Sequence, residues 1–288
     1  MSAQSVQILL HHKAEICKLK SQTIVILLVR NYAEFDCQRI DCLCRSFLQC
    51  QSYPEQVTSW SLSSNRELNV ENRTTKVSRL LKAYQDYLES SDTAQFVACI
   101  ARNYTNATLV AILDRCDVLH RRAAALALGF LGDISCQDSL GLALCSSDRR
   151  LRLVSDDTLR ALWARDASDE QRSMLDKIIR LNECDLFEES VALCDQLIEN
   201  APKYLEAYNQ RALALFHLRD FDRSIDDCRK VLKLSRFHYG AWIGMGHCLL
   251  ENGDVWGALD SFRMALSIYP DLEPVRLQIR TLERSLQG

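Results

Sequence analysis

The chain has 288 residues, of which 48% are hydrophobic and 25% are charged. This balance is that of a globular protein with enough apolar mass for an extended core. The formal net charge of −3 excludes a general basic excess of the kind that condenses on nucleic acid or on an anionic membrane. Four prolines and nine glycines are few, which favours helices joined by short turns.

The first 72 residues differ in character from the rest. Their apolar run, residues 24–29, is far shorter than the roughly 20 residues of a membrane-spanning helix. They hold five of the thirteen cysteines, namely Cys17, Cys37, Cys42, Cys44 and Cys50. No Cys-x-x-Cys pair occurs and the spacing matches no zinc site, so we predict no metal and interpret the cysteines as reduced thiols. Residues 1–72 are predicted to be an extension whose order the pattern leaves open.

Residues 73–168 carry a short helical repeat. Asp117 and Arg121 lie four residues apart, as do Asp148 and Arg152, and the two pairs are 31 residues apart. The run at residues 121–133, rich in alanine and leucine, resembles the inner helix of a HEAT-like repeat. This resemblance implies stacked helical hairpins in which Asp and Arg side chains form an internal ladder between units.

A second interpretation of the same segment stays open. Arginine side chains match phosphate oxygens, and five of them could form an exposed stripe: Arg121, Arg122, Arg149, Arg150 and Arg152. Nucleic-acid binding or a lyase-like enzyme function, centred on residues 117–165, is therefore an alternative. Few aromatic residues interleave with these arginines, which argues against nucleic acid.

The C-terminal third repeats with a period of 34 residues. Phe187, Phe221 and Val255 share one register, and Tyr208 and Trp242 share another. The last unit carries the fullest pattern, in Trp242, Met245, Gly246, Leu249, Ala258, Phe262, Ala265 and Pro270. These residues resemble the signature of the tetratricopeptide repeat, a hairpin of helix A and helix B.

The predicted fold class is therefore all-α, an α–α superhelix in which HEAT-like repeats precede a tetratricopeptide array. The array is predicted at residues 169–288, with units at 171–202, 205–236 and 239–270 and a capping helix at 273–287. Such a hairpin cannot bury its apolar side alone, so stacking and a terminal cap are required. The combination resembles bacterial proteins of mixed repeat type.

The resemblance to tetratricopeptide arrays implies a partner-binding groove on the concave face, lined by the A helices. Its positions fall on Leu175, Ile179 and Glu183 in the first unit, on Asn209, Gln210, Leu213, Phe216 and His217 in the second, and on Ile243, Gly244, His247, Leu250 and Glu251 in the third. For Ile179 and Leu213 a core position is an equal alternative. The groove is predicted to be apolar with polar edges, which suits a helical or extended segment of another protein.

One subclass of the family holds the carboxylate tail of heat-shock chaperones in a clamp of Lys, Asn and Arg side chains. The matching positions are Leu175, Ile179, Gln210, Gly240 and Gly244, and none of them is a cation. We therefore predict that the chain does not bind such acidic tails.

No reactive constellation is found in the sequence. It has no glycine-rich phosphate loop, no Gly-x-Ser-x-Gly elbow and no His-Glu dipeptide, which are signatures of nucleotide, hydrolase and metal chemistry. We predict a cytoplasmic, non-catalytic scaffold with a protein or peptide partner, without a cofactor, a small-molecule substrate or a membrane contact. A permanent structural subunit of a larger assembly is the remaining alternative.

Overall fold

The computed structural model describes residues 79–286, so the predicted extension at residues 1–72 and its cysteines lie outside the described residues. The chain divides into two compact units, and the larger, Leu80–Tyr84 with Thr93–Gly288, holds every helix from α3 onward. Over residues 79–286 the structure is helical and has no strand, which confirms the all-α fold class. In the same range no single helix is long and apolar enough to cross a membrane, and α3 with α4 meets that test only as a pair bent by 97°.

After a helix at residues 79–90, five α-helices and one 3-10 turn precede the 34-residue repeat. They are α3 (Thr93–Asn103), α4 (Asn106–Arg115), α5 (Val118–Leu131), η1 (Ile134–Cys136), α6 (Gln137–Leu144) and α7 (Arg149–Arg165). The two periodic aspartates begin helices: the side chain of Asp117 accepts the N–H of Leu119, and that of Asp148 accepts the N–H of Leu151. Each carboxylate thus satisfies a backbone donor that the first turn of a helix leaves unpaired.

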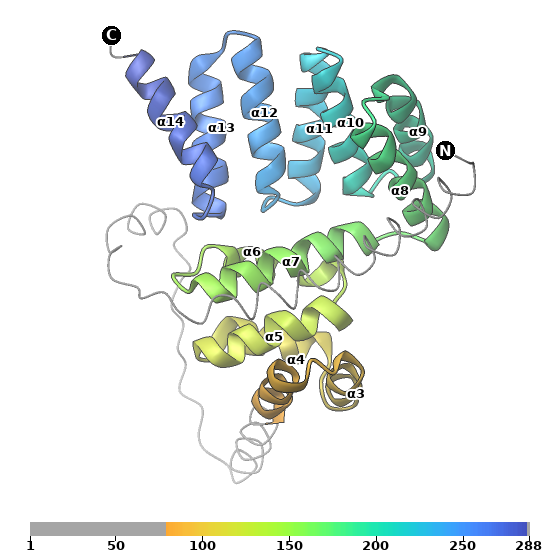
Figure 1. Cartoon of the computed structure of the whole chain (residues 1–288), viewed down its shortest axis with the longest axis vertical. Helices are drawn as coiled ribbons and strands as arrows, with labels where there is room; N and C mark the ends of the chain where they lie inside the picture. Colours follow the sequence, from red (N-terminus) through yellow and green to blue (C-terminus); the bar gives the residue numbers. More distant parts are fainter. Residues whose placement is uncertain (1–78, 287–288) are drawn as a thin grey trace, which may run out of the picture. The chain divides into compact units, whose positions relative to one another are not determined.

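Seven helices form the C-terminal repeat (Figure 1): α8 (Asp169–Glu183), α9 (Phe187–Asn200), α10 (Leu205–His217), α11 (Phe221–Leu234), α12 (Tyr239–Glu251), α13 (Val255–Ile268) and α14 (Glu273–Ser285). The B helices α9, α11 and α13 begin 34 residues apart, and so do α10, α12 and α14. The tetratricopeptide-like helical repeat predicted from the sequence is therefore confirmed.

The turn between helix A and helix B has the same backbone in all three units. Asp185, Arg219 and Gly253 adopt left-handed conformations, with φ of 58°, 62° and 81°. In each turn the next N–H donates to a carbonyl five residues back, as from Asp254 to Leu249 at 2.9 Å. This hydrogen bond satisfies a carbonyl at the end of helix A, and glycine is the residue that accepts the conformation without cost.

The units fill the gap between helix A and helix B in complementary ways. In the third unit a Cβ atom at Gly246 would come within 2.7 Å of the Phe262 ring, so a large ring fits only because the facing residue has no side chain. In the first unit the corresponding positions are Ile178 and Cys194, which share one buried cluster. The larger residue of the pair lies on helix B in the third unit and on helix A in the first, so each gap is filled from the opposite side.

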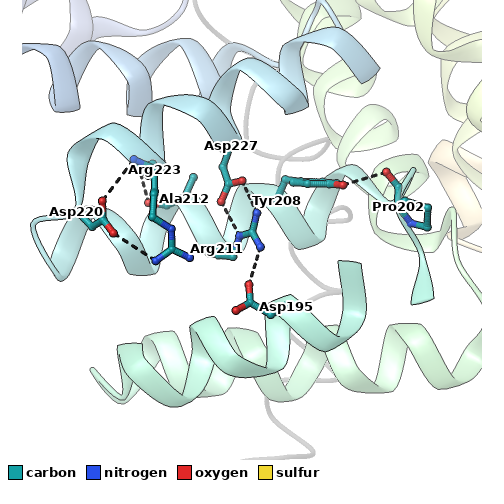
Figure 2. A network of polar contacts seen from close by, with 9 residues as sticks. Asp195, Pro202, Tyr208, Arg211, Ala212, Asp220, Arg223 and Asp227 are labelled. Carbon is teal, nitrogen blue, oxygen red and sulfur yellow. Dashed lines mark hydrogen bonds and ion pairs between the residues drawn. The ribbon is translucent and has the colours of Figure 1, made fainter. Parts of the chain in front are cut away.

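An ion triad, of which only Asp227 is buried, ties three successive helices of the array together (Figure 2). Arg211 of α10 donates to both carboxylate oxygens of Asp227 of α11, at 2.6 and 2.7 Å, and to Asp195 of α9 at 2.6 Å. The hydrogen bonds to Asp227 raise the pKa of Arg211, so the guanidinium stays charged. The triad fixes the register of α9, α10 and α11.

The helices α6 and α7 pack against the loops that join one unit of the array to the next. Phe237 lies so close to Gly141 of α6 that a Cβ atom there would come within 2.1 Å of its ring. The rings of Trp163 of α7 and His238 are 4.5 Å apart, and the Tyr204 hydroxyl donates to a carbonyl of α7 at 2.6 Å. We call the loops at residues 201–204, 235–238 and 269–272, which α6 and α7 contact, the loop edge of the array.

Polar groups fix the same loop edge. Arg152 of α7 donates to both carboxylate oxygens of Asp271 at 2.6 and 3.0 Å, and to the carbonyl of Ser146 at 2.7 Å. The Tyr239 hydroxyl donates to Asp156 at 2.7 Å. Arg152 is only 9% exposed, so these hydrogen bonds are needed to offset the loss of its hydration.

Candidate partner-binding face

The A helices of the array form one continuous surface. Helix α10 packs against both α8 and α12. The side-chain amide of Asn182 donates to the Gln210 side chain at 3.1 Å across the first boundary, and the rings of Phe216 and His247 lie 6.3 Å apart across the second. Side chains of neighbouring A helices therefore meet on one face of the array.

We call this surface, with its continuation on α14, the inner face. On α8, α10 and α12 its residues occupy the same four positions of the 34-residue repeat. A fifth position contributes on α10, α12 and α14, and Thr281 of α14 continues one of the four. They are Asp176, Ile179, Asn182, Glu183, Asn209, Gln210, Leu213, Phe216, His217, Ile243, Gly244, His247, Leu250, Glu251, Leu277 and Thr281.

Most of the predicted groove residues reach the surface of the inner face. The side chain of Leu213 is 44% exposed. Glu183, His217 and Glu251 are exposed as well. A larger set is half-buried, comprising Ile179, Asn209, Gln210, Phe216, Ile243, Gly244, His247 and Leu250. The half-buried members form the floor of the face, and the exposed ones rise from it.

Leu175 does not belong to this face, which corrects the prediction for that residue. It is 3% exposed and lies in the buried cluster with Ile178, Cys194 and Tyr204. Residues at the start of the second unit cover it, so it is a core side chain that a partner cannot reach. Ile179 packs against the same cluster but stays half-buried.

Rings of four helices meet beside the inner face. His217 stacks on Phe187 with centroids 4.5 Å apart and planes 2° apart. Next to it, Phe216 lies 6.3 Å from His247, which in turn lies 5.1 Å from Phe262. Burial lowers the pKa of His247. The ring is therefore neutral at pH 7, and it adds apolar rather than cationic surface to the face.

At the end of the A helices next to α7, the continuation of the inner face is covered by other residues of the protein. The Glu206 carboxylate lies 3.6 Å from Nε2 of His238 and accepts from the Asn209 amide at 3.0 Å. Burial alone would raise the pKa of Glu206, but hydrogen bonds from His238, Asn209 and Gln210 outweigh it and hold the pKa below its usual value. This ionised carboxylate is satisfied within the protein, with the Trp163 ring beyond His238.

Four inner-face residues, Asp176, Asn182, Leu277 and Thr281, were missed by sequence reasoning. Leu277 of α14 is 64% exposed and lies one period after Ile243. Asp176 is exposed, and Asn182 bridges α8 to α10. The signal for Leu277 was present, because α14 keeps the 34-residue register. The sequence reading treated that helix only as a cap with one buried side.

Within residues 79–286 no group of His, Cys, Asp and Glu side chains could hold a metal ion. Of the cysteines in that range, Cys99, Cys136, Cys184, Cys194, Cys228 and Cys248 are free thiols. Burial raises the pKa of Cys194 and of Cys228 to about 12. Thiols with such a pKa are protonated at neutral pH and are poor nucleophiles.

The fold and the inner face together define a helical-repeat protein. No protein-family model and no curated protein matches the sequence. Among solved structures, the first tetratricopeptide domain of Spaghetti (RPAP3) bound to an HSP90 peptide is 17% identical, covering 42% of this chain and 97% of that one, with a TM-score of 0.41.

Two further structures share the helical repeat at similar distance. The TPR2AB domain of yeast Sti1, in a complex with HSP90, is 15% identical and covers 76% of this chain and 100% of that one, with a TM-score of 0.38. TTC0263, a tetratricopeptide protein of Thermus thermophilus, is 14% identical and covers 73% and 98%, with a TM-score of 0.32. Likenesses of this size decide neither a partner nor a binding surface.

Proposed function

We propose that the protein is a non-catalytic scaffold whose inner face binds a segment of another protein. The observation that carries the proposal is the exposure of two large apolar side chains, at different register positions of the repeat, on a face that no other helix of residues 79–286 covers. Leu213 is 44% exposed and Leu277 is 64% exposed. Apolar side chains gathered on one face mark interaction sites, and their removal from water favours binding by about 25 cal/mol per Å².

The proposed contact surface keeps the predicted groove residues except Leu175 and gains Leu277. It consists of Ile179, Glu183, Asn209, Gln210, Leu213, Phe216, His217, Ile243, Gly244, His247, Leu250, Glu251 and Leu277. A face built from the A helices of three units is short. It suits a peptide-sized helical or extended segment rather than a whole folded domain.

We also propose that α4 to α7 are HEAT-like hairpins, which makes the chain a mixed-repeat scaffold. In support, Arg122 of α5 donates to Asp148 at the start of α7 at 2.8 Å, as a ladder between units requires. The pairing of Arg152 with Asp271 extends the ladder into the array. In this proposal the division predicted near residue 168 separates two repeat types within one compact unit.

The same contacts weigh against a phosphate-binding stripe at residues 117–165. Arg121 donates to the carbonyl of Leu113 at 2.8 Å, and Arg122 and Arg152 are engaged with carboxylates. Arginines held in this way have few donors left for phosphate. A salt-dependent mobility shift of DNA or RNA would revive the nucleic-acid alternative, and lyase activity would revive the enzyme.

A pull-down with the full chain as bait tests the scaffold. Leu213→Asp and Leu277→Asp are expected to release specific partners while leaving the unfolding midpoint unchanged, because both side chains are exposed. Leu142→Asp is the matched control, since Leu142 of α6 is 57% exposed and lies outside the inner face. Partner retention that survives both inner-face substitutions would overturn the proposal.

We propose a cytoplasmic location as well, because thirteen cysteines without a paired spacing suit a reducing compartment.

Light scattering of the pure chain separates a transient binder from a permanent subunit. A monomer that gains partners only on mixing supports the former. Co-purification in fixed stoichiometry supports the latter.

A further inference from the structure

The exposed charges of the inner face between α8 and α12 are all carboxylates. Asp176, Glu183 and Glu251 are exposed. Asp176 and Glu183 form no ion pair within residues 79–286, and Glu251 has only the exposed Arg219 at 3.4 Å. A pair of that kind is worth little. The face therefore presents negative charge beside its exposed leucines.

Two arginines of α8 lie near these carboxylates but are not available to neutralise them, and Arg284 of α14 is exposed at the register position of Leu250, so the negative charge is confined to the part of the face between α8 and α12. Arg172 is used within its own turn, where it donates to a backbone carbonyl at 2.9 Å and to an acidic neighbour. Arg180 occupies the register position of Ala214 and Cys248, which are buried, so it lies at the end of the array and not on the inner face. The first hairpin, residues 169–200, holds nine acidic and three basic side chains.

We infer that the segment bound by the inner face is apolar and basic. Its large apolar side chains cover Leu213 and Leu277, and its lysine or arginine residues face Asp176, Glu183 and Glu251. The inference rests on the proposed function, because it specifies the chemistry of the partner for that same face.

Charge complementarity selects this occupant over others. Carboxylates on a binding face speed the approach of a basic segment, and they make its affinity depend on salt. An acidic segment would bring like charges together on the same face. A second copy of the chain, docked by its own inner face, would do the same, because a two-fold contact pairs a surface with itself.

Selection from a phage-displayed library of random peptides of about 16 residues, with the full chain as bait, tests the inference. Enriched peptides are expected to combine large apolar residues with a net positive charge. The affinity of a selected synthetic peptide, measured by calorimetry, is expected to fall about fivefold between roughly 0.05 and 0.3 M NaCl. Enriched peptides that are neutral or acidic would overturn the inference.

Charge reversal locates the effect on the inner face. The double variant Asp176→Lys/Glu183→Lys is expected to weaken binding of the selected peptide about tenfold. The control Glu189→Lys/Glu199→Lys changes net charge equally at two exposed positions of α9 and is expected to weaken it less than about twofold. Equal losses in both variants would contradict a specific role for the inner-face carboxylates.

The same selection separates failure of the inference from failure of the proposed function. If peptides enriched on the wild type bind equally well to Leu213→Asp/Leu277→Asp, the inner face is not the binding face and both proposals fail. If the peptides require these leucines but carry no positive charge, the scaffold proposal stands and only the basic partner is rejected.

Discussion

The loop edge and the inner face of the array carry similar side chains but bury them to different extents. At the loop edge, Phe237 and Tyr204 are 8% and 2% exposed, and Arg152 has its carboxylate partner. On the inner face, Leu213 and Leu277 are 44% and 64% exposed. The fold uses two helices, α6 and α7, to cover one surface and leaves the other open. In our proposal the open surface binds a partner, and the covered one stabilises the array.

If the loop edge stabilises the array, Arg152→Ala should have the largest effect. The substitution leaves Asp271 without its bidentate partner, so we expect a loss of about 3 kcal/mol in the free energy of unfolding. Urea unfolding measures it. Arg229→Ala is the control, because that arginine pairs with Asp226 at exposed positions, where a loss under about 0.5 kcal/mol is expected. Similar losses in the two variants would contradict a stabilising loop edge.

A methyl group at Gly141 should disturb the same contact sterically. Gly141→Ala drives a Cβ atom into the Phe237 ring, and such overpacking costs about 2 kcal/mol. Gly244→Ala on α12 should have the opposite effect on stability. Its Cβ would meet only the Cys228 sulfur at 3.4 Å, so the better helix former should stabilise by about 0.5–1 kcal/mol. Thermal unfolding of both variants checks this, and a stable Gly141→Ala chain would show that the helices dock differently.

The stability contributed by Glu206, at the end of the A helices next to α7, should depend on pH. The pKa of Glu206 is lowered from 4.5, so its carboxylate contributes stability that is fully present above pH 4.5 and is lost as pH falls through the folded-state value. Glu206→Gln should therefore cost about 1–2 kcal/mol at pH 7, and this cost should shrink below pH 4.5. Unfolding free energies across this range provide the test. A cost that does not change with pH would show that the charge of Glu206 is unimportant.

At the turns on the opposite edge of the array, backbone conformation should outweigh side-chain contacts, because the ion pair of Arg219 with Glu251 is exposed and worth little. Gly253 is left-handed and a Cβ there would meet nothing within 4 Å, so Gly253→Ala should cost about 1 kcal/mol through conformation alone. Arg219→Gly relieves the same strain in the second unit and should be neutral or stabilising. Chemical unfolding of the pair would contradict this view if both changes were destabilising by the same amount.

The sequence predicts the array well because its signals are local and periodic. Phe187, Phe221 and Val255, which share one register in the sequence, are the first residues of the three B helices. The place of Leu277 on the inner face could also have been predicted, since it keeps the register of Ile243. Leu175 shows the limit of this reasoning. Its register position is half-buried in the later units, but in the first unit Tyr204 and its neighbours cover it.

The loop edge could not be predicted from the sequence. The contact of Gly141 with Phe237 and the pair of Arg152 with Asp271 each join residues about a hundred positions apart, and neither repeats. The 34-residue period of the sequence predicts only those features that each unit shares with the next. Contacts made once, between α6 or α7 and the array, leave no such trace.

Site-directed photo-crosslinking in cells tests most directly whether the inner face is the binding surface. A photoreactive phenylalanine analogue replaces Leu213 in one chain and Leu142 in another, two exposed leucines on different surfaces. We predict that partner adducts form from position 213 and not from position 142. Adducts from position 142 alone, or equal adducts from both, would contradict the assignment of partner binding to the inner face.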